Sequence, residues 1–279
     1  MLLIECDFSS RPTLRKPIVM ARGGLNSAGQ VVLDGLDRLD SLEDFARWLA
    51  RPADWLGAFD FPFGLPRELV RHLGWPLAWE ACMRHYAGRK RQDIRAEFAA
   101  FCNARPAGAK FAHRATDGPA GSSSSMKWVN PPVAYMMHAG VPALIEAGVH
   151  VPGLFAGNPH NVGAAGFPRR IALEAYPGLA AREVLGRQSY KSDDKRKQTP
   201  QRQANRSQLL DALESGGTRF SLAVHLAGSD RETLKTDATG DSLDAVLCLV
   251  QAAWGWLQGP PWFGLSPDLD PIEGWIVGA

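Results

Sequence analysis

Short apolar runs that end at polar or turn-forming residues mark the first strands of the chain. The run 2–8 is apolar apart from its acids and ends beside one of them, which is typical of a buried strand. The runs 17–22 and 30–33 follow, and turn-forming residues at 26–29 lie between them, so this stretch predicts a β-hairpin. A fourth run, 55–61, predicts another strand and is stopped by a proline.

A helix is predicted between the third and fourth strands. Ser41 is a suitable N-cap, Asp44 follows three residues later, and Trp48 and Leu49 continue an apolar helical face. The order is therefore three strands, a helix and a strand. A clear fifth strand appears only at 170–176, much too far along the chain for an ordinary connection.

The intervening stretch, 63–167, contains helical patterns of its own. They lie near 66–72, 77–86, 93–103 and 132–139, and a Gly/Ser-rich loop is expected at 118–125. We expect this stretch to be a helical insertion, or lid, on an α/β core made from 1–62 and 168–279.

The chain after the fifth strand is polar before it becomes helical. The segment 189–206 is basic and lacks a hydrophobic period, so it predicts a mobile loop that leads into a helix at 203–213. A longer apolar helix is predicted at 241–257, and the tail 272–277 is predicted to be an edge strand.

Charge is distributed unevenly along the chain. The 279 residues are 45% hydrophobic and 22% charged, an ordinary balance for a globular protein, and the net charge is only +2. Eight basic and two acidic side chains lie between Arg84 and Arg114, and eight basic and three acidic ones lie between Arg182 and Arg206. A basic face on an acidic body suits a polyanionic partner such as nucleic acid, although two solvated faces or loops explain the charge equally well.

Cysteines and apolar runs bear on the cellular setting. The four cysteines form no C-x-x-C pair, so neither a zinc site nor a redox pair is expected. The longest apolar run, 245–257, is too short to cross a membrane, and the first ten residues, with Glu5 and Asp7, are unlike a signal peptide. We expect a reducing, cytoplasmic setting without a membrane partner.

Acids in apolar strands provide the candidate chemistry. Asp7, Asp60 and Glu174 each lie in or at the end of an apolar strand, and Asp241 and Asp244 share one face at the start of the last apolar helix. A buried carboxylate is costly unless it is paired, hydrogen-bonded or bound to a cation, so these acids suggest a shared site for Mg²⁺ or Mn²⁺. We expect Asp7, Asp60 and at least one of the other three to converge within roughly 8 Å.

Each acid also has a purely structural explanation. Asp7 and Asp60 could form hydrogen bonds within turns, and Glu174 could pair with an arginine just before it. Asp241 is well placed as an N-cap, and Asp244 as a partner of the helix dipole. These explanations hold well for each acid singly and less well for all of them together.

The motifs that contain these acids resemble a known family. The order of strands, helix and acids is similar to the ribonuclease H-like fold, and the pair Asp241 and Asp244 resembles its Holliday-junction resolvase version. More closely, CDFSS, FDFPFGLP, LEAYP followed by SYK, and GDSLDAVLC resemble the DUF429 family of predicted ribonuclease H-like nucleases. The resemblance covers 2–62 and 168–258.

The resemblance implies roles for particular residues. Asp7, Asp60, Glu174 and Asp244 become candidate catalytic residues, and these four with Asp241 become candidate metal ligands. Lys191 of SYK becomes a candidate phosphate contact, although a solvated loop lysine is an equal alternative. Charge adds further candidates for binding a phosphate backbone, namely Arg89, Lys90, Arg91, Lys195, Arg196 and Lys197.

The combined hypothesis is a divalent-metal-dependent phosphodiesterase, a nuclease, that uses clustered carboxylates to hold Mg²⁺ or Mn²⁺. The first alternative is a catalytically inactive nucleic-acid-binding or scaffold protein on the same fold. The second alternative is a carboxylate-based hydrolase of another phosphorylated or glycosidic substrate. The sequence has no H-E-x-x-H, G-x-S-x-G, G-x-x-x-x-G-K-[ST] or G-x-G-x-x-G motif that would favour other chemistries.

Overall fold

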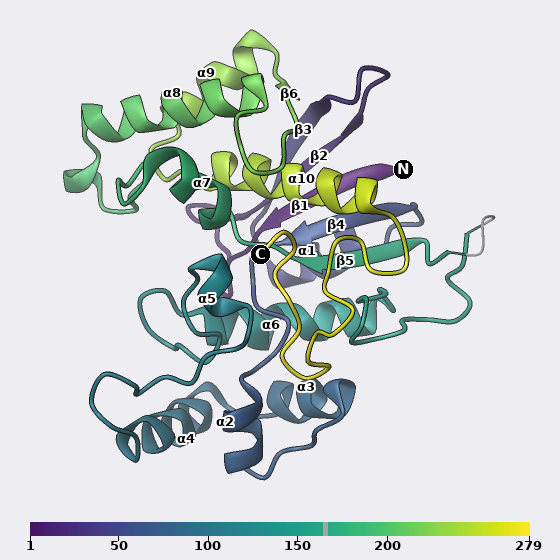
Figure 1. The fold of residues 1–279 in the computed structure, drawn as a ribbon, viewed down its shortest axis with the longest axis vertical. Coiled ribbons are helices and arrows are strands. Elements are labelled where there is room, and N and C mark those ends of the chain that lie inside the picture. Colours follow the sequence, from purple (N-terminus) through teal and green to yellow (C-terminus); the bar gives the residue numbers. More distant parts are fainter. Residues whose placement is uncertain (164–166) are drawn as a thin grey trace.

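A mixed sheet with helices on both faces forms the centre of the protein (Figure 1). The structure is a computed structural model, and it describes residues 1–163 and 167–279. Within these residues six strands lie side by side in the order β5-β4-β1-β2-β3-β6. Their bounds are β1 Leu2–Asp7, β2 Ile18–Leu25, β3 Val31–Leu39, β4 Trp55–Phe59, β5 Arg170–Glu174 and β6 Val224–His225.

The strand directions divide the sheet into an antiparallel and a parallel part. β2 runs antiparallel to β1 and β3, whereas β4 runs parallel to β1, and β5 runs parallel to β4. Nearly every residue of β1, β4 and β5 is buried, as expected for parallel strands that are covered on both faces. Because these three strands point the same way, Asp7, Asp60 and Glu174 lie at the same edge of the sheet.

Helix α10 (Asp241–Gln258) covers one face of the sheet and contacts β1, β2 and β4. Every residue from Ser242 to Ala253 is buried, which explains why this stretch of the sequence is apolar on all sides of the helix. Three further helices pack on the same side, and their apolar residues join one core with α10 (Figure 1). They are α7 (Gly178–Leu185), α8 (Pro200–Ser215) and α9 (Gly228–Thr236).

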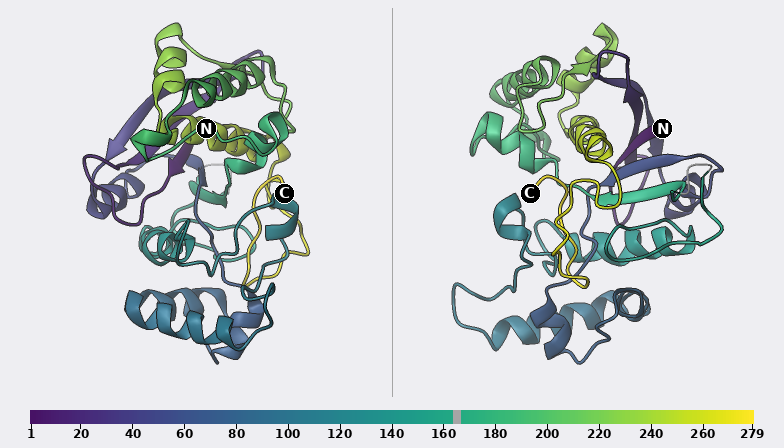
Figure 2. Two further views of the ribbon diagram at one scale, coloured as in Figure 1. Left: turned by 90° about the vertical axis from the view of Figure 1, so that its left-hand side faces the viewer. Right: turned by 45° about the vertical axis from the view of Figure 1, so that its right-hand side comes forward.

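The opposite face is covered by α1 (Leu42–Leu49) and by α6 (Val133–Glu146), which contact each other. Gly140 of α6 allows close packing against Phe61, which follows β4, because a Cβ there would lie 2.7 Å from the Phe61 ring. Of the helices between β4 and α6, the first three extend away from the sheet to the end of the molecule farthest from α8 and α9, and the last, the single turn α5 (Asp117–Ala120), lies nearer the centre (Figures 1 and 2). The first three are α2 (Arg67–His72), α3 (Trp79–Ala87) and α4 (Arg91–Asn103).

Most of the predicted elements are present, including the first five strands and the helix capped by Ser41, whose hydroxyl accepts from the Asp44 amide. The predicted loop 118–125 differs, because the helical turn α5 extends into it. The tail 272–277 also differs, because it makes one isolated bridge, between Ile276 and Glu174, in place of an edge strand. The predicted α/β fold class is confirmed. No helix among residues 1–163 and 167–279 is both long and apolar enough to cross a membrane.

The structure corrects the bounds of the loop predicted at 189–206, because regular structure begins within it. A short 3-10 turn (Lys195–Lys197) and the start of α8 at Pro200 lie within it. The segment has no hydrophobic period, and hydrogen bonds from its polar side chains to backbone carbonyls hold it in place. Asn205 donates to the Ser189 carbonyl (3.0 Å), and Arg206 donates to the Tyr190 carbonyl (2.7 Å). The polar composition therefore holds this segment against α8.

Candidate functional site

Three carboxylates converge at the edge where the parallel strands end. Asp7 is the last residue of β1, Asp60 directly follows β4, and Asp244 lies in the first turn of α10. One oxygen from each can be chosen so that the three atoms lie within 4.8 Å of one another. The expected convergence is therefore present, and a single cation could contact all three oxygens.

Mutual repulsion and burial change the protonation of this group. Burial and the Asp244 carboxylate raise the pKa of Asp60 to about 7, although Lys191 opposes the shift. Burial and Asp244 also raise the pKa of Asp7 well above its ordinary value, and Lys191 again opposes the shift. Carboxylates crowded in this way favour either a shared proton or a cation between them.

Two neighbouring residues hold Asp244 in place. The Tyr190 hydroxyl donates to one oxygen of the Asp244 carboxylate, and the Lys191 ammonium donates to the other. Burial disfavours a charged ammonium, but Asp244, Tyr190 and Asp7 more than compensate and raise the pKa of Lys191 well above its ordinary value. Lys191 is therefore a fixed positive charge beside the cluster, and its role as a phosphate contact stays a prediction.

Glu174 lies beside the three oxygens but is bound elsewhere. Arg114 donates from Nη1 to Oε2 (2.8 Å) and from Nη2 to Oε1 (2.6 Å), and the Phe63 amide donates to Oε2 (2.9 Å). Both charged side chains are buried, and Arg114 also contacts Asp117. The pairing partner of Glu174 is thus Arg114, not an arginine next to it in sequence. Its predicted role as a ligand stays a prediction that requires release from Arg114.

Asp241 is near the cluster but outside the three converging oxygens. It is the first residue of α10, and the N-cap is Gly240, which has φ 78°. The suggestion that Asp241 caps the helix is therefore wrong: the Asp237 carboxylate instead accepts from the Ser242 amide (3.1 Å). Burial raises the pKa of Asp241, with Lys191 acting against the shift. Its role as a ligand stays a prediction.

Glu5 is a further acid on β1, and the sequence alone predicts that it either assists the site or pairs with a nearby Arg or Lys. It lies two residues before Asp7, so its side chain is on the same face of β1. It is fully buried, and no group in the described residues hydrogen-bonds either carboxyl oxygen. Burial, and then the charges of Asp7, Asp60 and Asp244, raise its pKa well above the ordinary value. The alternative that Glu5 pairs with a nearby Arg or Lys is not found in this part of the chain.

The predicted basic contacts fall into two groups. Arg89, Arg91 and Arg196 already have protein partners: Arg89 pairs with Glu97, Arg91 donates to the Ser10 carbonyl, and Arg196 pairs with Asp194. The side chains with exposed ammonium groups are Lys90, Lys195 and Lys197.

The loop that follows Asp7 supplies basic residues that sequence reasoning missed. Arg11, Arg15 and Lys16 are exposed in this loop, and Lys16 pairs with Asp193 (2.5 Å) of the segment before α8. The signal was present in the sequence, because RPTLRK directly follows CDFSS. The two basic segments thus meet at the rim of the acidic cluster.

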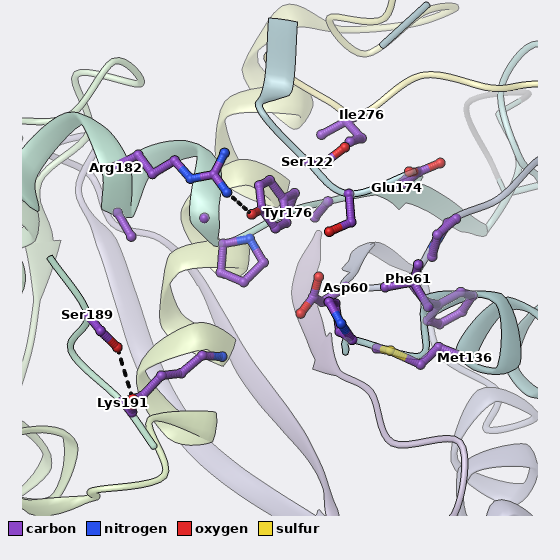
Figure 3. A pocket seen from close by; sticks show the side chains of 18 of the residues that line it. Asp60, Phe61, Ser122, Met136, Glu174, Tyr176, Arg182, Ser189, Lys191 and Ile276 are labelled. Carbon is purple, nitrogen blue, oxygen red and sulfur yellow. Dashed lines mark hydrogen bonds between the residues drawn. The ribbon is translucent and has the colours of Figure 1, made fainter. Parts of the chain in front are cut away.

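A cavity of about 480 Å³ adjoins the cluster, and it too was not foreseen. Asp60 and Lys191 line it together with Tyr176, Arg182 and Met136 (Figure 3). A cavity could not be read from the sequence because its walls come from β5, α7, α6 and the loop after α5.

The arrangement is chemically suited to a hard divalent cation next to an anionic substrate. Three carboxylate oxygens supply ligands that Mg²⁺ and Mn²⁺ prefer, and the Lys191 ammonium lies beside them. The cavity offers room for a further part of the substrate. Comparison of the chain with protein-family models, with curated proteins and with solved structures found no match in any of the three.

Proposed function

We propose that the protein is a divalent-metal-dependent phosphodiesterase, a nuclease, that uses Mg²⁺ or Mn²⁺. The observation that carries the proposal is the convergence of Asp7, Asp60 and Asp244, whose oxygens lie within 4.8 Å of one another. These residues lie at the ends of two strands and in one helix, far apart in sequence. Their convergence is therefore not a consequence of closeness along the chain. Burying carboxylates that bind neither a cation nor another partner costs much free energy of folding.

The sheet supports a ribonuclease H-like core for this activity. Strands β1 to β3 form an antiparallel unit, α1 follows, and β4 and β5 add parallel strands on the other side of β1. Acids at the end of β1, directly after β4 and on the last long helix match the order that the DUF429 resemblance implies.

The charges at the site fit one divalent cation. Asp7, Asp60 and Asp244 carry three negative charges when ionised, and Lys191 supplies one positive charge, so two negative charges remain. A bound Mg²⁺ or Mn²⁺ would activate a water molecule and stabilise the leaving oxygen of a phosphodiester. Tyr190 and Lys191 orient the Asp244 carboxylate towards that role, as hydrogen-bonded outer residues do in metal sites.

The partner in this proposal is a nucleic acid or another phosphorylated substrate. Lys90, Lys195 and Lys197, with Arg11 and Arg15 of the loop after Asp7, would contact phosphates around the site. A catalytically inactive scaffold on the same fold is favoured by one observation, namely that Lys191 already neutralises part of the acidic cluster without a cation.

Replacing Asp7 tests the activity. Asp7→Asn preserves the shape of the side chain but removes a charge that holds the cation, so cleavage should fall on the order of 10²-fold or more. The matched control is Asp34→Asn, an exposed acid on β3. Both variants and wild type are assayed on single-stranded, duplex and branched DNA, RNA and hybrids, with Mn²⁺, Mg²⁺ or EDTA. Cleavage that persists in EDTA, or that is equal in Asp7→Asn, contradicts the mechanism. Folded wild type that cleaves none of these substrates supports the scaffold alternative.

A further inference from the structure

The cavity beside the acidic cluster has the size of a small-molecule site. Its volume of about 480 Å³ lies within the range of about 300–1,000 Å³ that is usual for such sites. One wall comes from the segment before and within α6, including Ser123, Val133 and Met136, and the other from β5, α7 and the chain up to Lys191. Asp60 belongs to both the cavity and the carboxylate cluster, so the two are continuous (Figure 3).

The lining combines an aromatic ring with apolar, hydroxyl and charged groups, and the charged groups include Arg187 and Lys191. The Tyr176 ring has the Arg182 guanidinium 5.5 Å from its centroid, and its hydroxyl accepts from Arg182 Nη2 (2.9 Å) (Figure 3). Arg182 also donates to the Gly121 carbonyl, so it joins α7 to the loop after α5 at the cavity wall. Met136 adds apolar surface and Ser123 adds a hydroxyl. An aromatic face with dispersed hydrogen-bonding groups is the environment that accepts a nucleobase.

We propose that this cavity holds the unpaired base of a single nucleotide whose phosphate lies at the Asp7, Asp60 and Asp244 carboxylates. The placement of the phosphate rests on the proposed function, whereas the placement of the base rests on the cavity. Bases inside a duplex are stacked and paired, and they enter a cavity of this kind only after they leave the stack. The substrate class is therefore a free nucleotide or an unpaired or terminal nucleotide of a strand, and not the interior of a continuous duplex.

Binding of small probes tests the cavity without any need for cleavage. The four nucleoside 5′-monophosphates, and inorganic phosphate as a probe that lacks a base, are titrated into the full-length protein with Mn²⁺ by calorimetry. Ser123→Trp fills the cavity and should weaken monophosphate binding at least 10-fold while phosphate binding is unchanged. Ser229→Trp, at an exposed site on α9, is the matched control and should bind as wild type does. Tyr176→Ala removes the stacking surface and should weaken monophosphate binding about 10-fold, which keeps the test decisive if Ser123→Trp does not fold.

Circular substrates separate this inference from the proposed function. With Mn²⁺, a single-stranded DNA circle should be cleaved at least 10-fold faster than a covalently closed duplex circle of the same sequence, and Ser123→Trp should abolish the preference. Equal cleavage of both circles, unaffected by Ser123→Trp, overturns the inference and leaves the phosphodiesterase proposal intact. Monophosphate binding that Ser123→Trp weakens, in a protein that cleaves nothing, retains the base site and rejects the phosphodiesterase. Monophosphates that bind no better than phosphate overturn the base site.

Discussion

At the scale of single residues, the carboxyl groups at the ends of the apolar strands determine how the folded protein binds protons near the site. Asp7 and Asp60 are half-buried and face Asp244, which is fully buried. Their raised pKa values mean that the folded protein without a cation binds protons more tightly than the unfolded chain does. A divalent cation would remove the need for those protons.

The stability of the metal-free protein should therefore fall as the pH rises. The ordinary pKa of Asp60 is 3.8 and its folded value is about 7, so the stabilising protonation is complete below the first value and lost on passing the second. In EDTA, the free energy of unfolding in urea should decrease between pH 4 and pH 7 by on the order of 1–2 kcal/mol, after solvent screening of a half-buried group is allowed for. Asp60→Asn should flatten this dependence, and Mn²⁺ should reduce it. Stability that increases over this pH range in EDTA would contradict the assignment.

Lys191 should matter more to stability than its exposed neighbours. Lys191→Met keeps the length of the side chain but leaves the buried Asp244 carboxylate without its ion-pair partner. Breaking a buried pair in this way costs about 3–5 kcal/mol, and Lys191 is partly exposed, so we expect the lower end of that range in EDTA. Mn²⁺ should recover more stability in Lys191→Met than in wild type, because the competing ammonium is gone. Lys16→Met, which removes an exposed pair with Asp193, should cost at most about 1 kcal/mol.

At the scale of elements, one buried ion-pair network joins the segment between β4 and β5 to the rest of the fold. Arg114 precedes α5, yet its guanidinium contacts Glu174 at the end of β5 and the Glu273 carbonyl near the end of the chain. Asp117 at the start of α5 completes the network. These contacts position the wall of the cavity that faces the acidic cluster.

A double-mutant cycle on this network should reveal strong coupling. Arg114→Leu leaves the buried Glu174 carboxylate without its charged partner and should destabilise the protein by about 3–5 kcal/mol in urea unfolding. Adding Glu174→Leu should recover part of the loss, because the unpaired charge is then removed. Arg84→Leu, which breaks an exposed pair with Glu80 on α3, is the control and should cost at most about 1 kcal/mol. Additive effects of Arg114→Leu and Glu174→Leu would argue against the network.

At the scale of the whole molecule, basic segments gather around an acidic centre. The loop after Asp7 and the turn Lys195–Lys197 are linked to each other through the Lys16–Asp193 pair. They are far apart in sequence, and folding brings them to the rim of the same site. A polyanion that binds this basic rim would have its phosphates close to the carboxylate cluster.

Nucleic-acid binding should therefore weaken steeply with salt. For duplex DNA, the logarithm of the association constant should fall with the logarithm of the salt concentration by about 0.9 per phosphate contacted. Charge reversal at Lys195 and Lys197 to Glu should flatten that slope in fluorescence anisotropy. Arg71→Glu on α2, at the opposite end of the molecule, should leave it unchanged (Figure 1). No detectable binding to DNA or RNA at low salt would favour a small phosphorylated substrate.

The sequence by itself determined the elements and the candidate acids. Apolar runs and caps are local signals, so β1, β4, the Ser41-capped helix α1 and the apolar helix α10 could be predicted from neighbouring residues alone. The acids Asp7 and Asp60 stood out for the same reason, since charge is conspicuous within an apolar run. Local signals failed where polar side chains satisfy distant carbonyls, as Asn205 does in the segment that was expected to be mobile.

Only the tertiary structure decided which of these acids share a site. Whether Glu174 faces a cation or an arginine depends on Arg114, which lies 60 positions away along the chain and reaches it through folding. The binding of Lys191 to Asp244 and the cavity between α6 and α7 likewise arise from contacts between elements remote in sequence. The physical reason is range: hydrophobic period and capping act over a few residues, whereas charge pairing and enclosed space depend on atoms that come together only when the whole chain packs.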